Sequence, residues 1–317
     1  MKFPIGIQDF VKLREEGFLY VDKTERIYDL ITKAAGPVFL SRPRRFGKSL
    51  LCSTLGAIFE NKRELFKGLA IDSSDWQWKR YPVVRIDLNP GNYSRGIEEL
   101  SVTIKSAIES CAVRYDVPFV GETNSNCLSR LIENLHNRYN ERVVVIIDEY
   151  DKPLLSTIDN PKLNIQLRDA LKGFYAVLKS SDEHLKFVFL TGVTKFSKVS
   201  IFSDLNNLTD ISLSPKYGDL CGITQEELEK NFQDNINEIT KNASIKKEDY
   251  LEKLRRFYNG YRFSSNPITV YNPFGLLNHF NNEGLFLSYW YETGTPTFLI
   301  KLIKNQNIDI INLKKMT

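Results

Sequence analysis

The fold follows from one basic stretch of the sequence, Ser41-Arg42-Pro43-Arg44-Arg45-Phe46-Gly47-Lys48-Ser49. It comes after a short apolar run at 37–40 and before a segment with helical spacing at 49–59. Its end, Gly47-Lys48-Ser49, matches the end of the phosphate-binding pattern GxxxxGK[ST], which joins a strand to a helix. The stretch therefore predicts a strand, a phosphate-binding loop and a helix, in that order.

Each residue type in this loop suits the binding of a nucleotide. Gly47 allows phosphate to approach the backbone, and the unpaired N–H groups and dipole of the following helix attract it. Lys48 can reach the β- and γ-phosphates, and Ser49 can bind Mg²⁺. We therefore expect a site for ATP and Mg²⁺, with these nucleotide-binding residues: Arg44, Arg45, Phe46, Gly47, Lys48, Ser49 and Leu50.

The loop also departs from the usual pattern. The first glycine of the pattern falls at Arg42, and Pro43 has no N–H group to offer an anion. The loop therefore cannot form the usual cradle of backbone donors. The side chains of Arg42, Arg44 and Arg45 either replace those donors or face another partner.

A second half-motif lies about 100 residues further on, where the aliphatic run Val143–Ile147 ends in Asp148-Glu149. This is the Walker B form, in which a buried strand delivers an acidic residue to the edge of the sheet where ligands bind. We expect Asp148 to hold Mg²⁺, directly or through water, and Glu149 to act as the general base on the attacking water. The alternative is a strand that ends in a solvated acidic turn.

A third apolar run, at 187–190, ends in Thr191. A polar residue at this point can sense the γ-phosphate or position the attacking water. Thr191 is our candidate for this catalytic role, and Thr194 is the alternative. The alternative is a threonine that only caps a helix or packs in the core.

The remaining pattern predicts an α/β fold. Weaker strands fall at 82–88 and 208–213, and helical spacing recurs between the strands. Alternating strands and helices imply a mostly parallel sheet flanked by helices, as in a P-loop NTPase. The predicted helices between the strands are 97–111, 128–139 and 163–178.

After about residue 214 the sequence carries mainly helix and turn signals. Thr224 and Glu227 have the spacing of a capping box, and 247–257 has helical spacing. The pair Asn259-Gly260 is a turn signal that also suits a hairpin. We predict a core domain over 1–214 and a smaller helical, lid-like domain over 215–317.

The composition narrows the class of protein. The 317 residues are 42% hydrophobic and 26% charged, which excludes a disordered or fibrous chain. The net charge of +4 is too small to argue for nucleic acid. The four cysteines form no CxxC pair, so neither a zinc site nor a disulfide framework is expected. No apolar run could span a membrane and no signal peptide is visible, so we expect a cytoplasmic protein.

Further motifs join these along the chain. They are Gly6-Ile7-Gln8-Asp9-Phe10, Tyr20-Val21-Asp22-Lys23-Thr24, the loop Arg42 to Ser49, Asp148-Glu149-Tyr150-Asp151, Thr191-Gly192-Val193-Thr194-Lys195-Phe196, Phe257-Tyr258-Asn259-Gly260-Tyr261-Arg262-Phe263, Tyr271-Asn272-Pro273-Phe274, Tyr289-Trp290 and Thr293-Gly294. In this combination the chain resembles the AAA-ATPase-like domain family of bacteria, over about residues 1–300.

The resemblance implies a P-loop ATPase core with a helical lid. It also implies that longer relatives carry a nuclease-like domain of the PD-(D/E)xK type after the ATPase, beyond the 317 residues of this chain. In related ATPases a segment such as Tyr20–Thr24 lies near the adenine, so it is a candidate base pocket, with simple packing against the core as the alternative. Arg262 either senses the γ-phosphate or stacks on its aromatic neighbours.

Three hypotheses follow for the function. The first is an Mg²⁺-dependent ATP-binding protein and ATP hydrolase that serves as a regulatory or motor module for a partner or a nuclease-like domain. The second is a nucleotide-dependent switch or scaffold that does not hydrolyse. The third is a nucleic-acid-binding module that uses the basic loop Arg42–Arg45. The sequence does not decide between ATP and GTP. It also leaves open whether the chain forms a homo-oligomer and in which pathway it acts.

Overall fold

The computed structural model of the chain describes residues 1–195, 201–202, 205 and 207–289. Several features of the sequence analysis lie outside these residues. They are Phe196, Trp290, the pair Thr293-Gly294 and the end of the predicted lid-like domain at 290–317.

The centre of the molecule is a five-stranded sheet in which every pairing is parallel, as the alternating sequence pattern predicts. The strand order is β2-β3-β4-β1-β5, so β3 and β4 lie between β1 and β2. This architecture is consistent with a P-loop-like fold. The strands are β1 (Val38–Ser41), β2 (Val83–Asp87), β3 (Val143–Asp148), β4 (Leu185–Gly192) and β5 (Thr209–Asp210).

The register of the strands brings their carboxyl ends to one edge of the sheet. Asp87 at the end of β2 pairs with Asp148 at the end of β3. Leu40 near the end of β1 pairs with Thr191 of β4, and Ser41 pairs with Gly192. In open parallel sheets ligands bind at this edge, so the register positions the polar strand ends for a common site.

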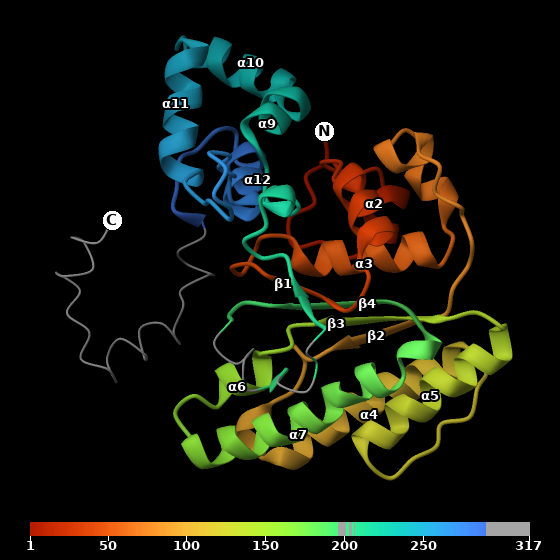
Figure 1. Cartoon of the computed structure of the whole chain (residues 1–317). Coiled ribbons are helices and arrows are strands. Elements are labelled where there is room, and N and C mark those ends of the chain that lie inside the picture. Colours follow the sequence, from red (N-terminus) through yellow and green to blue (C-terminus); the bar gives the residue numbers. More distant parts are fainter. Residues whose placement is uncertain (196–200, 203–204, 206, 290–317) are drawn as a thin grey trace.

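Helices cover both faces of the sheet (Figure 1). Alternate residues of β3 show why its sequence is apolar throughout. Val143, Val145 and Ile147 join the buried cluster that includes helices α4, α5 and α7, whereas Val144 and Ile146 join the cluster on the side of α2 and α3. The covering helices are α2 (Thr24–Lys33), α3 (Lys48–Phe59), α4 (Ile97–Arg114), α5 (Asn124–Tyr139) and α7 (Pro161–Ser180).

The predicted helices are therefore confirmed, with ends that differ by a few residues. The start of α7 shows the local cause, because Asn160 caps it by accepting a hydrogen bond from the N–H of Leu163, and Pro161 occupies the first helical position. The short helices of the core are α1 (Phe10–Glu15) and α6 (Lys152–Ser156), with 3₁₀ turns at Arg63–Phe66, Ala70–Ser73, Tyr93–Arg95, Asp182–His184 and Pro215–Tyr217.

Four further helices gather on the α2–α3 side of the sheet (Figure 1). They pack on one another through a third buried cluster, which includes Leu228, Phe232 and Phe280. The N-terminal Phe3 stacks on Phe232 with ring centroids 6.0 Å apart, so both ends of the described chain meet here. The helices are α9 (Gln225–Asn231), α10 (Gln233–Asn242), α11 (Lys247–Tyr258) and α12 (Pro273–Asn281).

The turn signals of this region have different outcomes. The capping box is confirmed, because Thr224 and Glu227 each accept a hydrogen bond from the other's backbone N–H. The pair Asn259-Gly260 is not the turn of a hairpin. It directly follows α11, and the N–H of Asn259 bonds to the carbonyl of Arg255. A longer loop is instead closed by an antiparallel bridge between Tyr261 and Val270.

All four cysteines are free thiols and are buried. Among the described helices, none is long and apolar enough to cross a membrane.

Candidate functional site

The loop from Arg42 to Gly47, called here the 42–47 loop, joins β1 to α3. Gly47 caps α3 with a left-handed backbone, at φ +86° and ψ +18°, which glycine adopts without strain. A Cβ built on Gly47 would meet no other atom within 4 Å, so this side of the loop is open. The unpaired N–H groups of the first turn of α3 therefore begin at an accessible point.

The side chain of Lys48, the first residue of α3, is enclosed by this loop and is almost fully buried. Its Nζ donates hydrogen bonds to the carbonyls of Arg42, at 3.1 Å, and Pro43, at 3.3 Å. The same atom is 3.3 Å from Oε1 of Glu149. The ammonium group thus joins the two half-motifs that lie far apart in the sequence.

The end of β3 is held by the neighbouring strand. Oδ1 of Asp148 accepts a hydrogen bond from the Thr191 hydroxyl at 2.9 Å, and another from the Glu149 N–H at 3.0 Å. Thr191 is fully buried, so its hydroxyl orients the Asp148 carboxylate. Glu149 has a left-handed backbone with φ +55°, which is unusual for a residue other than glycine, at the point where its side chain meets Lys48.

Thr194, the alternative to Thr191, has another partner. Its hydroxyl donates to the fully buried carboxylate of Asp151 at 2.7 Å, and burial raises the pKa of that carboxyl. The turn needs Gly192, because a Cβ there would lie 2.4 Å from the Tyr150 ring and 2.5 Å from the Asp151 carboxylate. Of the two threonines, only Thr191 lies beside Asp148.

A hollow of about 140 Å³, called here the acidic hollow, lies at the edge of the sheet beside Ser49 and Asp148. Asp87 also lines it. Its side chain is exposed to solvent, but partial desolvation at the hollow, together with the charges of Asp148 and Glu149, raises the pKa of Asp87. In the described part of the chain no three His, Cys, Asp or Glu side chains form a cluster able to hold a metal by themselves. The lining residues are Gln8, Asp9, Ser49, Cys52, Arg85, Ile86, Asp87, Ile146 and Asp148.

Sequence reasoning missed Asp9 and Asp87 as parts of this hollow. The signal for Asp87 was present, because it is a polar residue near the end of the predicted strand at 82–88, and it pairs with Asp148 at the end of β3. Asp9 belongs to the motif Gly6-Ile7-Gln8-Asp9-Phe10, which was assigned no role in the site. It caps α1 by accepting from the Lys12 N–H at 2.8 Å, and this places its carboxylate against Ser53 of α3.

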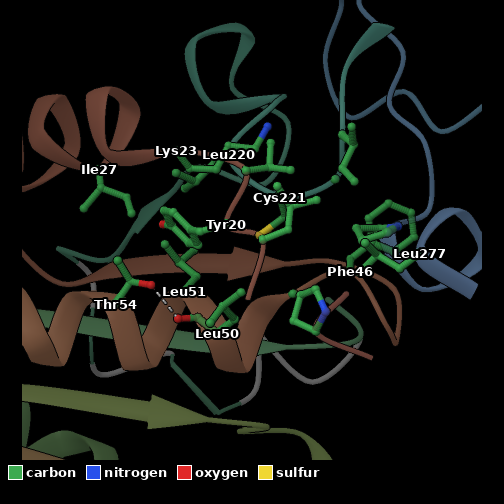
Figure 2. A pocket seen from close by; sticks show the side chains of 17 residues that line it. Tyr20, Lys23, Ile27, Phe46, Leu50, Leu51, Thr54, Leu220, Cys221 and Leu277 are labelled. Atoms are coloured by element: carbon green, nitrogen blue, oxygen red, sulfur yellow. Dashed lines mark hydrogen bonds between the residues drawn. The ribbon is translucent and has the colours of Figure 1, made fainter. Parts of the chain in front are cut away.

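A second hollow, of about 100 Å³ and largely apolar, lies on the other side of the start of α3 (Figure 2). We call it the apolar hollow. Figure 2 shows Tyr20 above Leu51 and Thr54 of α3, with Phe46 and Leu277 toward its other end. The lining residues are Pro4, Leu19, Tyr20, Val21, Lys23, Ile27, Phe46, Gly47, Leu50, Leu51, Thr54, Leu220, Cys221, Gly222, Ile223, Pro273 and Leu277.

Part of the Tyr20–Thr24 motif thus faces this hollow. Burial raises the pKa of the Tyr20 phenol, and Lys23 forms an ion pair with Glu227 of α9 at 2.6 Å. The residues before Thr24 are not a strand, and Thr24 begins α2. The segment ties the core to the C-terminal helices, and its side chains Tyr20, Val21 and Lys23 line the hollow between them.

The start of α3 therefore separates two environments. Ser49 lines the acidic hollow, whereas Gly47 and Leu50 line the apolar hollow. Lys48, between these residues, turns inward to the 42–47 loop and Glu149. Of the nucleotide-binding residues predicted from the sequence, Phe46, Gly47 and Leu50 thus line the apolar hollow and Ser49 the acidic hollow, with Lys48 between them. Arg44 and Arg45 line neither hollow.

The arginines of the loop have unequal surroundings. Arg42 is 1% exposed, and burial lowers the pKa of its guanidinium. It is therefore not accessible to an external phosphodiester, which corrects the expectation that Arg42 is one of the residues gripping nucleic acid. Arg44 and Arg45 are exposed, and the Arg45 guanidinium lies 4.6 Å from the ring centre of Phe274. Arg262 is exposed to solvent.

Comparison with known proteins gives two results. The family described as "Predicted AAA-ATPase" matches residues 4–202 of this chain. The chain is also 40% identical over 304 residues to a protein of Azotobacter chroococcum mcd 1 described as "Uncharacterized protein in vnfD 5'region". That match covers 95% of this chain and 56% of the Azotobacter protein, so the chain spans little more than half the length of that relative.

Proposed function

This chain belongs to the predicted AAA-ATPase family, and from that premise we propose that it binds Mg²⁺–ATP across the start of α3. One observation carries the proposal: Lys48 lies at the boundary between an apolar hollow and an acidic hollow. A nucleoside triphosphate has the matching polarity, because its base is flat and weakly polar and its phosphates are anionic and bind metal.

The phosphate chain would lie over Gly47 and the first turn of α3. Unpaired N–H groups at a helix start attract anions, and the open side of Gly47 allows the backbone to approach them. Lys48 supplies a buried cation at this point. Its present partners are two carbonyls and Glu149, and a phosphate would compete for the same ammonium group.

The residues of the acidic hollow fit Mg²⁺. Ser49 offers a hydroxyl and Asp148 a carboxylate, and Mg²⁺ prefers oxygen ligands. It is usually held by one or two carboxylates together with substrate phosphates and water, so a complete protein cage is not required. When bound, the metal would neutralise phosphate charge, while Thr191 keeps the Asp148 carboxylate in orientation.

The apolar hollow suits the base. Tyr20 provides a partly buried aromatic ring, and Leu50 and Leu277 provide apolar walls. The Tyr20–Thr24 motif supports this placement of the base, because three of its side chains line the hollow.

Glu149 is the proposed general base for hydrolysis. Its carboxylate is paired with Lys48. A phosphate that takes over Lys48 would release Glu149 to accept a proton from water. We further propose that turnover serves a regulatory or motor role for a partner or a nuclease-like domain, and the additional length of the Azotobacter relative leaves room for such a domain.

The test is calorimetric titration of the full chain with Mg²⁺–ATP, together with a turnover assay. Lys48→Ala should weaken binding about 100-fold, because charge-assisted hydrogen bonds to phosphate are lost. Lys162→Ala is the matched control, since Lys162 is an exposed lysine of α7 on the opposite face of the sheet. Glu149→Gln should keep binding and lose turnover.

The outcomes separate the hypotheses. If the parent does not bind ATP, or Lys48→Ala binds it equally well, the site is wrong. If the parent binds ATP but turns over no faster than Glu149→Gln, the chain is the nucleotide-dependent switch. Oligonucleotide binding that ATP does not affect would favour the nucleic-acid module, with Arg44 and Arg45 as its remaining loop arginines.

A further inference from the structure

Aromatic rings from the C-terminal part of the chain hold the 42–47 loop. The Arg42 guanidinium lies 4.2 Å from the ring centre of Phe263. Phe46 is buried edge-on against Phe263, at 5.4 Å between ring centroids, and against Tyr261, at 4.7 Å. The function proposed above gives the Phe263 ring no role, although it contacts two residues of the phosphate loop.

Arg42 fixes the loop by its hydrogen bonds as well. Its Nη1 donates to the carbonyls of Ser41, at 2.9 Å, and Ser212, at 2.8 Å, and its Nη2 donates to the carbonyl of Tyr217 at 2.9 Å. Among the described residues no carboxylate forms an ion pair with this guanidinium, so carbonyl dipoles and the Phe263 ring balance the buried charge. Displacing Arg42 would leave a buried cation and carbonyls without partners.

The backbone of the same residue contacts the lysine of the site. The Arg42 carbonyl accepts a hydrogen bond from Lys48 Nζ at 3.1 Å. Arg42 therefore connects Lys48, through its carbonyl, to Phe263, through its side chain. Phe263 in turn lies in the segment between α11 and α12, where Tyr261 bridges to Val270.

We propose that Arg42 is a positioning residue that occupies the place of the missing glycine, and that its contact with Phe263 couples the 42–47 loop to the segment Tyr261–Tyr271. A glycine at this position has no side chain, so the loop would not need a contact with another segment to hold its position. Arg42 instead makes the position of the loop depend on a ring contributed by a distant segment. The nucleotide-dependent half of this coupling rests on the proposed function, and the loop-positioning half does not.

The first experiment follows hydrogen exchange at the backbone amides of residues 44–49 in the full chain without nucleotide. Phe263→Leu removes the ring, and exchange in the loop should become about tenfold faster, since a desolvated cation–π contact and a buried ring pair are lost. The matched control is Phe286→Leu. Phe286 is also half-buried and also has a cation over its ring, Lys253 at 4.3 Å, but its ring contacts lie within the C-terminal helices.

Two further variants guard against a general loss of structure. Phe263→Tyr keeps a ring, so its loop should exchange like that of the parent. If any substitution at this position disturbed the loop, Phe263→Tyr would also exchange faster. Arg42→Lys keeps the charge but not the planar fork that reaches two carbonyls at once, so it should resemble Phe263→Leu. Thermal midpoints of all variants show whether the chain is folded.

The second experiment adds Mg²⁺–ATP. Binding should slow exchange in residues 261–271 of the parent and of Phe286→Leu, and not in Phe263→Leu, which should bind ATP about tenfold more weakly. A parent that binds no ATP overturns the proposed function, while the first experiment still tests the positioning role. A Phe263→Leu chain whose loop exchanges like the parent, or whose ATP affinity is unchanged, overturns the proposal for Arg42.

Discussion

The two hollows beside α3 share one helix start but are built in different ways. The acidic hollow takes its charge from the ends of parallel strands, where Asp87 and Asp148 lie in register. The apolar hollow takes its walls from segments outside the sheet, such as Tyr20 before α2 and Leu277 on α12. On the proposed function, the sheet would determine where phosphate and metal bind, whereas the connecting segments would determine which base is accepted.

The largest effect should come from the acidic side. Asp148→Asn removes the carboxylate charge but keeps an oxygen that can accept from Thr191, so the fold should persist. We expect the affinity for ATP to fall about 30-fold in Mg²⁺ and to stay near the parent's in EDTA, because the lost group acts on the metal. Calorimetric titration under both conditions measures this. An equal loss in EDTA would show that the substitution disturbs the loop and not a metal site.

A smaller effect is expected from the apolar side. Leu277→Trp should fill part of the apolar hollow and weaken ATP binding about tenfold, while inorganic triphosphate, which has no base, binds as it does to the parent. Leu285→Trp is the control, since Leu285 is 55% exposed and does not line the hollow. Competition titrations with the two ligands separate the sides. If both ligands weaken equally, the hollow is not a base pocket.

The same contrast explains how much the sequence could predict. The sheet edge was predictable because strands buried on both faces are apolar throughout, and their polar ends stand out, as at Asp148 and Thr191. Parallel pairing then brings such ends together without any knowledge of the loops. Asp87 ends its strand at the same edge, but it was harder to identify because β2 also contains the exposed Arg85.

The rest of the site depends on contacts between distant segments. The buried position of Arg42 comes from the carbonyls of Ser212 and Tyr217 and from the Phe263 ring, and no local pattern indicates those partners. An arginine beside a phosphate-binding motif is read from sequence as a ligand for phosphate, and here tertiary packing uses it as an internal support. Leu277 reaches the apolar hollow in the same non-local way.

The smallest effect should come from Asp87, which lines the acidic hollow without being an expected metal ligand. Partial desolvation and the charges of Asp148 and Glu149 raise the pKa of Asp87, although its side chain is exposed to solvent. Its carboxylate is charged above that pKa and attracts Mg²⁺, and it becomes neutral at a higher pH than an ordinary aspartate as the solution is acidified. The affinity for Mg²⁺ should therefore fall as pH is lowered.

Asp87→Asn should weaken Mg²⁺ binding to the ATP complex about threefold at neutral pH and should flatten its decline with acidification. Calorimetric titrations near neutral pH and about two pH units lower measure both effects. Asp182→Asn is the control, because Asp182 is exposed just before β4, at the opposite edge of the sheet. The calorimetric titration of this control variant measures how much of the pH dependence comes from protonation of ATP itself. A decline as steep in Asp87→Asn as in this control would mean that Asp87 does not contribute to the field at the metal, and the acidic hollow would reduce to Ser49 and Asp148.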